Sequence, residues 1–125
     1  VASGGELARF LLALKVVIAD RGSAPTLVFD EIDTGVGGAV ADAIGQRLAR
    51  LGAKVQVLSV THAPQVAAKA TRHYLIAKET TGKSAATRVK PLGFDLRREE
   101  LARMLAGETI TDEARAAAEK LQTVG

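Results

Sequence analysis

Apolar residues recur three or four positions apart in two stretches of the chain, a spacing typical of amphipathic helices. The first stretch runs from Glu6 to about Ala19, before a loop at 21–25 that contains glycine and proline. Its apolar positions are Leu7, Phe10, Leu11, Leu14, Val17 and Ile18. The second stretch follows a Gly-rich loop at 33–38, and Gly52 is a residue type that commonly follows the end of a helix. Its apolar positions are Val40, Ile44, Leu48 and Leu51.

Two short apolar runs predict buried parallel strands, at 26–29 and at 55–60. Polar residues that can do chemistry follow each run directly. Those residues are Asp30 and Glu31 after the first run, and Thr61 and His62 after the second. Because ligands of open α/β sheets bind beyond the carboxyl ends of the strands, this edge is the main indication of a functional site.

The second half of the chain predicts a short helix at 64–70, a hairpin and two closing helices. The hairpin strands are expected at 74–77 and 86–92, around a turn at 80–83. One closing helix ends at Gly107 and the other starts at Thr111. The apolar positions of these two helices are Leu101, Met104 and Leu105, and then Ala114, Ala117, Ala118 and Leu121. Alternation of strands and helices predicts an α/β fold class.

The amino-acid composition excludes several classes of protein and of binding site. A length of 125 residues with 47% hydrophobic and 25% charged residues fits one globular domain or part of one. Aromatic residues make up only 3%, which excludes a base-stacking platform for single-stranded nucleic acid. The absence of cysteine excludes disulfides and thiolate metal sites and fits a reducing cytoplasm. The net charge of +3 permits an anionic partner without requiring one.

No stretch approaches the roughly 20 apolar residues of a membrane span, so we expect no membrane contact. The first residues carry no basic region typical of a signal peptide. Since the chain starts at Val1 without an initiator methionine, we expect it to be a fragment whose N-terminal partner sequence is missing.

Asp30 and Glu31 have the chemistry that nucleotide hydrolysis needs. One carboxylate can hold Mg²⁺, directly or through water, because Mg²⁺ takes few carboxylates and keeps several waters. The second can orient or deprotonate the attacking water. The alternative is a solvated strand end followed by a turn, since an apolar run that ends in Asp-Glu is common.

The segment from Ser3 to Glu6 also has two interpretations. Ser-x-x-Glu before an apolar helix is a capping box. The same helix start offers free N–H groups and a positive dipole end to a phosphate, and Gly4 and Gly5 allow its backbone a close approach. A single histidine after a strand is more often a structural hydrogen-bonding residue than a catalytic one. The predicted place of His62 at the same sheet edge as the acids would nevertheless let it donate to a phosphate oxygen.

The order of these features is more specific than any one of them. Ser-Gly-Gly-Glu opens a helix, an apolar run ends in Asp-Glu, a Gly-rich loop follows, and a later strand ends in Thr-His. This order and spacing resemble the signature motif, Walker B motif, D-loop region and switch histidine of ATP-binding-cassette ATPases. Residues 1–7, 29–38, 60–67 and 101–107 specifically resemble the RecN family of SMC-like DNA-repair ATPases. The resemblance covers nearly the whole chain.

The resemblance implies that 1–125 is the C-terminal half of an ATPase head, with parallel strands flanked by helices. It implies ATP and Mg²⁺ as cofactors and a homodimer whose second head completes the site. It further implies a role in repair of DNA double-strand breaks and recombination, contact with DNA by the complete protein, and a bacterial cytoplasmic, nucleoid-associated location.

The resemblance also assigns roles to single residues. Glu31 would be the catalytic carboxylate, His62 the switch that senses the γ-phosphate, and Asp30 the residue that serves Mg²⁺. The signature that contacts ATP on the partner head would be Ser3, Gly4, Gly5 and Glu6. Asp33 is the candidate for the D-loop contact.

The chain departs from the transporter pattern in ways that favour the SMC-like group. Glu6 stands where transporters usually have Gln, and Ile32 where they usually have Pro. Gly37 occupies the usual position of the D-loop Asp, which leaves the role of Asp33 open. There is no P-loop sequence and no recognisable Q-loop. In the family these lie in the N-terminal lobe, before a coiled coil, so we expect ATPase activity of the complete protein and none of this fragment alone.

Three alternatives remain at the level of sequence. They are another SMC-like chromosome-maintenance ATPase, a metal-dependent hydrolase that uses Asp30, Glu31, Asp33 and His62, and a non-catalytic head-assembly module. Basic residues gather in the C-terminal half, and an ordinary solvated face is the preferred interpretation, with a phosphate-backbone patch as the alternative. These residues are Lys69, Arg72, Lys78, Lys83, Arg88, Lys90, Arg97 and Arg98.

Overall fold

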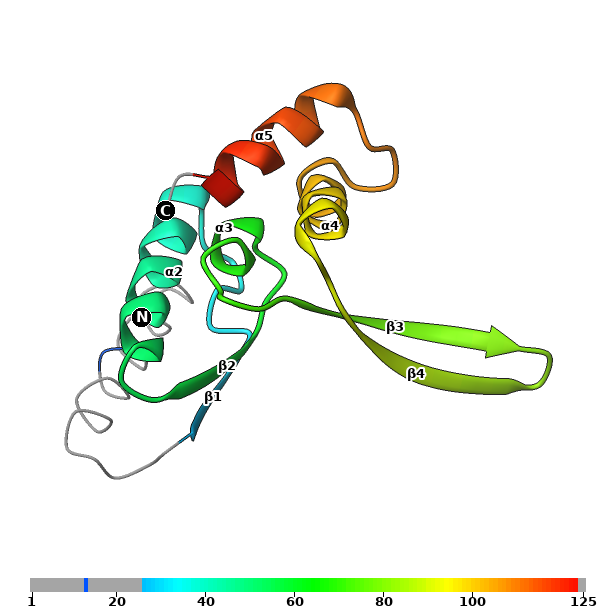
Figure 1. Cartoon of the computed structure of the whole chain (residues 1–125), viewed down its shortest axis with the longest axis horizontal. Helices are drawn as coiled ribbons and strands as arrows, with labels where there is room; N and C mark the ends of the chain where they lie inside the picture. The colour runs from blue at the N-terminus through cyan, green and yellow to red at the C-terminus, as the bar shows by residue number, and fades with distance from the viewer. Residues whose placement is uncertain (1–12, 14–25, 124–125) are drawn as a thin grey trace. The chain divides into compact units, whose positions relative to one another are not determined.

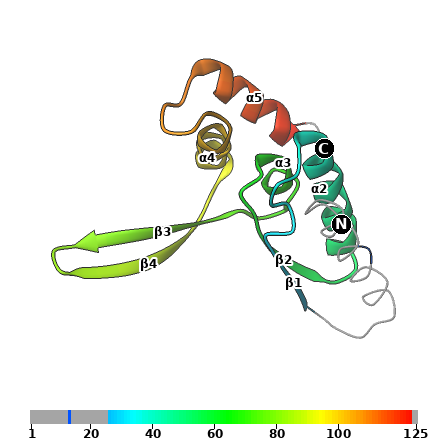
Figure 2. The same cartoon turned by 180° about the vertical axis from the view of Figure 1, so that it is seen from behind.

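The computed structural model describes residue 13 and residues 26–123, which form parts of two compact units. The first unit is Val1–Ala70 and the second is Thr71–Gly125. Figures 1 and 2 show their elements from opposite sides. The signature segment and, apart from residue 13, the predicted helix at 6–19 lie outside the described residues.

Two parallel strands organise the first unit. β1 (Thr26–Asp30) pairs with β2 (Gln56–Val60), and the register runs from Thr26 opposite Gln56 to Asp30 opposite Val60. The crossover between them contains helix α2 (Gly38–Gly52), as the alternating pattern predicted. The backbone N–H of Glu31 donates to the Val60 carbonyl at 3.1 Å, which continues the pairing one residue beyond β1. Both strands therefore end at the same edge.

The core of this unit lies between β1 and α2. Phe29 is fully buried and packs in one cluster with apolar residues of α2 and α3 (Pro64–Ala67). Those residues are Ala41, Ile44, Leu48, Leu51 and Val66. The prediction of strands buried on both faces holds for one face only, since Val28 is 56% exposed and Leu58 and Val60 are also exposed. Alternation along a strand explains the difference, because neighbouring side chains point to opposite faces.

The second unit begins with an antiparallel hairpin. β3 (Tyr74–Thr81) pairs with β4 (Ser84–Pro91), so both strands extend to a tight turn at Gly82 and Lys83. The strands are longer than predicted because Thr80 and Thr81, expected in the turn, pair with Ala85 and Ser84. Gly82 has φ 62, a conformation that glycine adopts without steric cost.

Two helices complete the second unit, and they pack on each other through small and aliphatic side chains. α4 (Phe94–Ala106) ends at Gly107, whose φ is 84, and α5 (Asp112–Thr123) follows Thr111, whose hydroxyl accepts the Ala114 N–H at 3.1 Å. The buried residues of the pair are Leu101, Ala102, Ala114 and Ala118. Ala117 and Leu105, predicted on the apolar faces, are exposed. No helix among the described residues has the length and apolar character that crossing a membrane requires.

Close packing of α2 on α3 depends on a glycine, which generates a stability prediction. A Cβ at Gly45 would lie 3.0 Å from the Gln65 carbonyl oxygen and 3.2 Å from the Val66 Cα. Overpacking costs about 1–3 kcal/mol, more than the roughly 1 kcal/mol that alanine gains over glycine in a helix. We expect Gly45→Ala to lower the free energy of unfolding in chemical denaturation.

Gly52→Ala is the matched control in the same helix. A Cβ there meets nothing within 4 Å. Gly52 is the last residue of α2, and its φ is not positive, so alanine fits its backbone. We expect that variant to be as stable as the parent or slightly more stable. Equal effects of the two substitutions would contradict the close contact at Gly45.

Candidate functional site

The edge where β1 and β2 end carries the predicted catalytic residues. Glu31 follows β1 and has φ 53, which makes it the one non-glycine residue with positive φ in the described part of the chain. Such a backbone is uncommon for residues with a side chain, and strain of this kind is concentrated at functional sites. The turn is fixed by its neighbours, because the Glu31 carbonyl accepts the Thr34 N–H at 3.3 Å.

The structure brings His62 to Glu31 across the strand ends. His62 Nε2 lies 3.6 Å from Glu31 Oε1, and their side chains are 84% and 57% exposed. The distance is too long for a hydrogen bond, and so exposed a pair contributes little to stability. Both side chains are therefore open to a third group, such as a water or a phosphate oxygen, placed between or above them.

Asp33 lies differently from the other acids. It is only 7% exposed, and its Oδ2 accepts a hydrogen bond from the Thr61 hydroxyl. The same hydroxyl oxygen accepts the Ala63 N–H at 2.9 Å. The Thr61 hydroxyl thus links Asp33, in the loop after β1, to the backbone of Ala63, in the turn that contains His62.

A hollow of about 390 Å³ adjoins this edge. Its lining includes Asp33, Gly35, His62, Pro64 and Gln65. Gln65 was missed by the sequence analysis, although a polar side chain directly after the Thr-His strand end and a proline was a usable signal. Gly37 precedes α2 and contributes no side-chain cap. The Gly-rich loop therefore shapes one wall of a hollow whose other wall follows β2.

The acids do not form a metal cluster. Within residues 26–123, no group of three or more His, Cys, Asp or Glu side chains is gathered closely enough to hold a metal ion. Asp30, Glu31, Asp33 and His62, which a metal-dependent hydrolase would use together, are therefore not gathered as one metal site in the structure. Exposed Asp30 at the end of β1 still fits the way Mg²⁺ is held with a nucleotide, by one or two carboxylates, waters and phosphates.

Curated proteins named DNA repair protein RecN match this chain over nearly its whole length. The one from Rickettsia felis is 50% identical over 97% of the chain and 22% of its own length. The Xylella fastidiosa Temecula1 protein gives the same values, and the Streptomyces coelicolor protein is 52% identical over 96% of the chain and 21% of its own length. The chain is thus homologous to RecN proteins and spans about a fifth of their length. No family model matches it.

Solved structures of SMC ATPase heads share the fold. One, described as "Structural biochemistry of ATP-driven dimerization and DNA stimulated activation of SMC ATPases", has a TM-score of 0.66 at 21% identity and covers 86% of this chain and 65% of that one. Another, an SMC head bound to the C-terminal winged-helix domain of ScpA, has a TM-score of 0.60 at 24% identity and covers 73% of this chain and 27% of that one. The predicted fold class, α/β with parallel strands, a hairpin and two closing helices, is confirmed, and the fold is that of SMC ATPase heads.

The hydroxyl of Thr61 generates a prediction about the edge. Thr61→Val keeps the shape but removes both the donor to Asp33 and the acceptor for the Ala63 N–H. Leaving such groups without their partner costs about 1–3 kcal/mol, and Thr61→Ser keeps the hydroxyl. We expect denaturant titrations to rank stability as parent, then Ser, then Val. A valine variant as stable as the serine variant would contradict the role of this hydroxyl.

Proposed function

We propose that this chain is the C-terminal half of the head of an SMC-like DNA-repair ATPase, with Glu31 as the carboxylate that activates water for ATP hydrolysis. The observation that carries the proposal is the placement of Glu31 and His62 together at the end of two parallel strands, 3.6 Å apart and open to solvent. RecN homology and the SMC-head fold support this assignment.

The geometry suits a hydrolytic site for a nucleoside triphosphate. Glu31 lies at the strand edge with its side chain exposed, where a carboxylate orients the attacking water. His62 would donate a hydrogen bond to a γ-phosphate oxygen and so respond to its presence. Asp30 would hold Mg²⁺, which supplies charge neutralisation for the phosphates when bound.

The remaining parts of the site would come from elsewhere. The chain contains no P-loop sequence, and the phosphate cradle with its lysine would belong to an N-terminal lobe. Ser3, Gly4, Gly5 and Glu6 would contact ATP held by a second head, so each site would be composite and the functional form a homodimer. In the complete protein ATP would drive head engagement during repair of DNA double-strand breaks in the bacterial cytoplasm.

Glu31→Gln in the full-length protein tests the catalytic carboxylate. The amide keeps the shape but cannot accept a proton, and positioned base catalysis is typically worth ~10²–10⁴-fold. We expect ATP turnover to fall by that factor, with ATP binding retained and engaged dimers accumulating. Phosphate release and equilibrium nucleotide binding measure the two effects separately.

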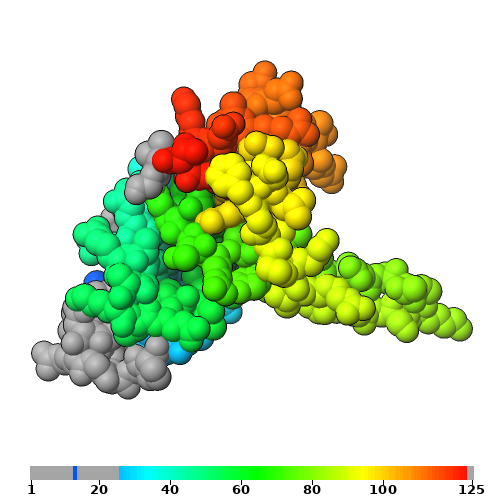
Figure 3. Space-filling model, in the orientation of Figure 1, coloured from blue at the N-terminus to red at the C-terminus, as the bar shows by residue number. Residues whose placement is uncertain are grey.

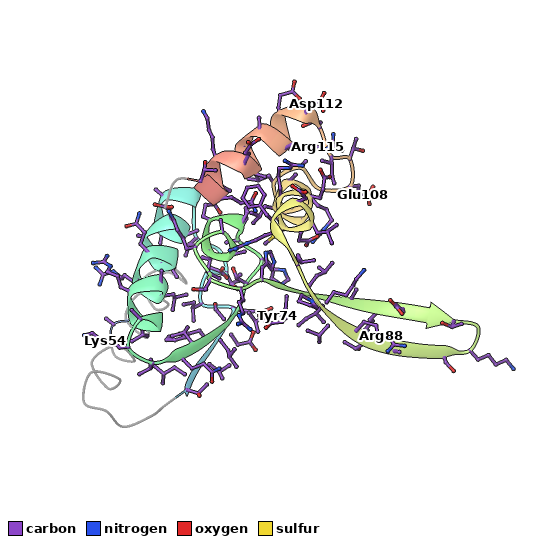
Figure 4. The ribbon with its side chains drawn as sticks, in the orientation of Figure 1. Lys54, Tyr74, Arg88, Glu108, Asp112 and Arg115 are labelled. Atoms are coloured by element: carbon purple, nitrogen blue, oxygen red, sulfur yellow. The ribbon has the colours of Figure 1, made fainter. Side chains whose placement is uncertain are left out.

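Glu108→Gln is the control for this experiment. It makes the same chemical change at an exposed residue between α4 and α5, which Figure 4 labels in the second unit. We expect its turnover to equal that of the parent. If Glu31→Gln also stayed within about twofold of the parent rate, the catalytic role of Glu31 would be rejected.

Mixing two inactive variants tests whether the signature acts in trans. One chain carries Ser3→Arg, which places bulk and charge where a close backbone approach is needed, and the other carries Glu31→Gln. Each homodimer has the same lesion in both sites, but a mixed dimer has both lesions in one site and none in the other. We therefore expect mixing to restore part of the ATPase activity.

The formation of mixed dimers is measured directly, by capture of differently tagged chains. Ser3→Ala replaces Ser3→Arg in a second mixture, because a milder change leaves head engagement intact. Absence of rescue in both mixtures, with mixed dimers present, counts against a composite site.

A further inference from the structure

The excess positive charge of the chain is concentrated in one hairpin. The whole chain has 17 Lys and Arg residues against 14 Asp and Glu residues. Within 74–91 the basic residues are Lys78, Lys83, Arg88 and Lys90, and Glu79 is the one acidic residue. The rest of the chain is balanced, with 13 basic and 13 acidic residues, so the hairpin carries the entire net charge of +3.

The hairpin displays these charges on an uncovered surface. Every residue from 78 to 91 is exposed, and Figure 3 shows this part of the hairpin extending away from the helices of the second unit. Arg88 lies 3.4 Å from Glu79, an exposed pair of little energetic weight. Among the described residues, no ion pair involves Lys78, Lys83 or Lys90. Their charges are free to meet an outside anion.

The register shows how the charges are arranged. Arg88 and Lys90 are two residues apart on β4 and therefore share a face, opposite Ala77 and Leu75. Lys83 lies in the turn at the tip. Apart from Glu79, the strands between Lys78 and Arg88 otherwise carry small side chains, and the hydroxyls among them belong to Thr80, Thr81, Ser84 and Thr87. The ribbon therefore carries Arg88 and Lys90 on one face together with Glu79, Lys78 on the other face, and a lysine with hydroxyls at its tip; Figure 4 labels Arg88 on β4.

We propose that the β3–β4 hairpin binds the phosphate backbone of duplex DNA. The inference rests on the proposed DNA-repair function and names the surface that contacts DNA. Lysine, arginine and hydroxyl side chains are the groups that most often contact phosphate oxygens. A two-stranded ribbon is narrow enough to follow or enter the major groove, which is about 12 Å wide.

The same features argue for duplex DNA over a single strand. Tyr74, at the base of the hairpin, is its one aromatic residue, and stacking platforms of single-strand binders need several. Apart from its charged residues the distal ribbon carries only small side chains, and its lysines are expected to contact phosphates, so binding is expected to be largely independent of sequence and strongly dependent on salt. Lysine contacts to phosphates have this dependence because they release condensed counterions.

The test is DNA binding by the full-length protein with Lys83→Gln and Lys90→Gln combined. The probe is a fluorescein-labelled duplex of mixed sequence, titrated at several salt concentrations. Each lost phosphate contact changes the slope of log K against log salt by about 0.9. We expect the slope to become shallower by about two and affinity at 0.1 M salt to fall by up to roughly 60-fold.

Lys54→Gln with Lys120→Gln is the matched control. It removes the same charge from exposed lysines outside the hairpin, one after α2 and one in α5, and Figure 4 labels Lys54. We expect its salt slope and affinity to equal those of the parent. Equal losses in both double variants would show that the loss of affinity comes from net charge and not from the hairpin, which would overturn the proposal. Unchanged binding by the hairpin variant would overturn it as well.

Two further measurements separate this proposal from the proposed function. ATP turnover without DNA should be unchanged in the hairpin variant, which also reports an intact fold. A parent protein that neither hydrolyses ATP nor binds DNA would contradict the proposed function itself. A photo-crosslinker attached through Ser84→Cys, in a segment that contains no other cysteine, should react with the duplex. The proposal would also be overturned if the crosslinker reacted with single-stranded DNA or with a protein but not with the duplex.

Discussion

Parallel pairing of β1 with β2 in a fixed register is the constraint on which the candidate site depends. Since Asp30 lies opposite Val60, the next residue of each strand emerges at one edge, and His62 comes within 3.6 Å of Glu31. A shift of one residue would send every side chain of a strand to the other face and remove Phe29 from the core. The burial of Phe29 against α2 therefore fixes the site as well as the fold.

A second link holds the edge once the strands have placed it. The Thr61 hydroxyl joins Asp33, in the loop after β1, to the Ala63 N–H, in the turn after β2. His62 lies between the two residues of that turn, so its backbone is held while its side chain stays exposed. Rigid backbone with accessible side chains is what a site for positioning water and phosphate requires.

The sequence predicted the elements well where local periodicity decides them, and less well where distant pairing does. Helix α2 was predicted correctly because four apolar residues between Val40 and Leu51 recur at helical spacing. Thr80 and Thr81 were assigned to a turn, yet antiparallel pairing with Ala85 and Ser84 satisfies their backbone and extends the hairpin. The hydrogen bond between Asp33 and Thr61 could not be predicted from local pattern either, because the two residues lie 28 positions apart in sequence. The signature at Ser3 stays a prediction.

Electrostatics explain why such a site would need other segments to work. Asp30, Glu31 and Asp33 lie at or near the edge, and among the residues that the structure describes no lysine or arginine lines the hollow beside them. A triphosphate brought to three carboxylates without compensating cations would be repelled at short range. Mg²⁺ at Asp30 would offset part of that repulsion, and the lysine of a P-loop and the helix start of a partner signature would offset more. With acids at this edge and the net positive charge of the chain in the hairpin, the charge distribution fits the proposed site, in which a neighbouring lobe and a second head would bring positive groups to the nucleotide.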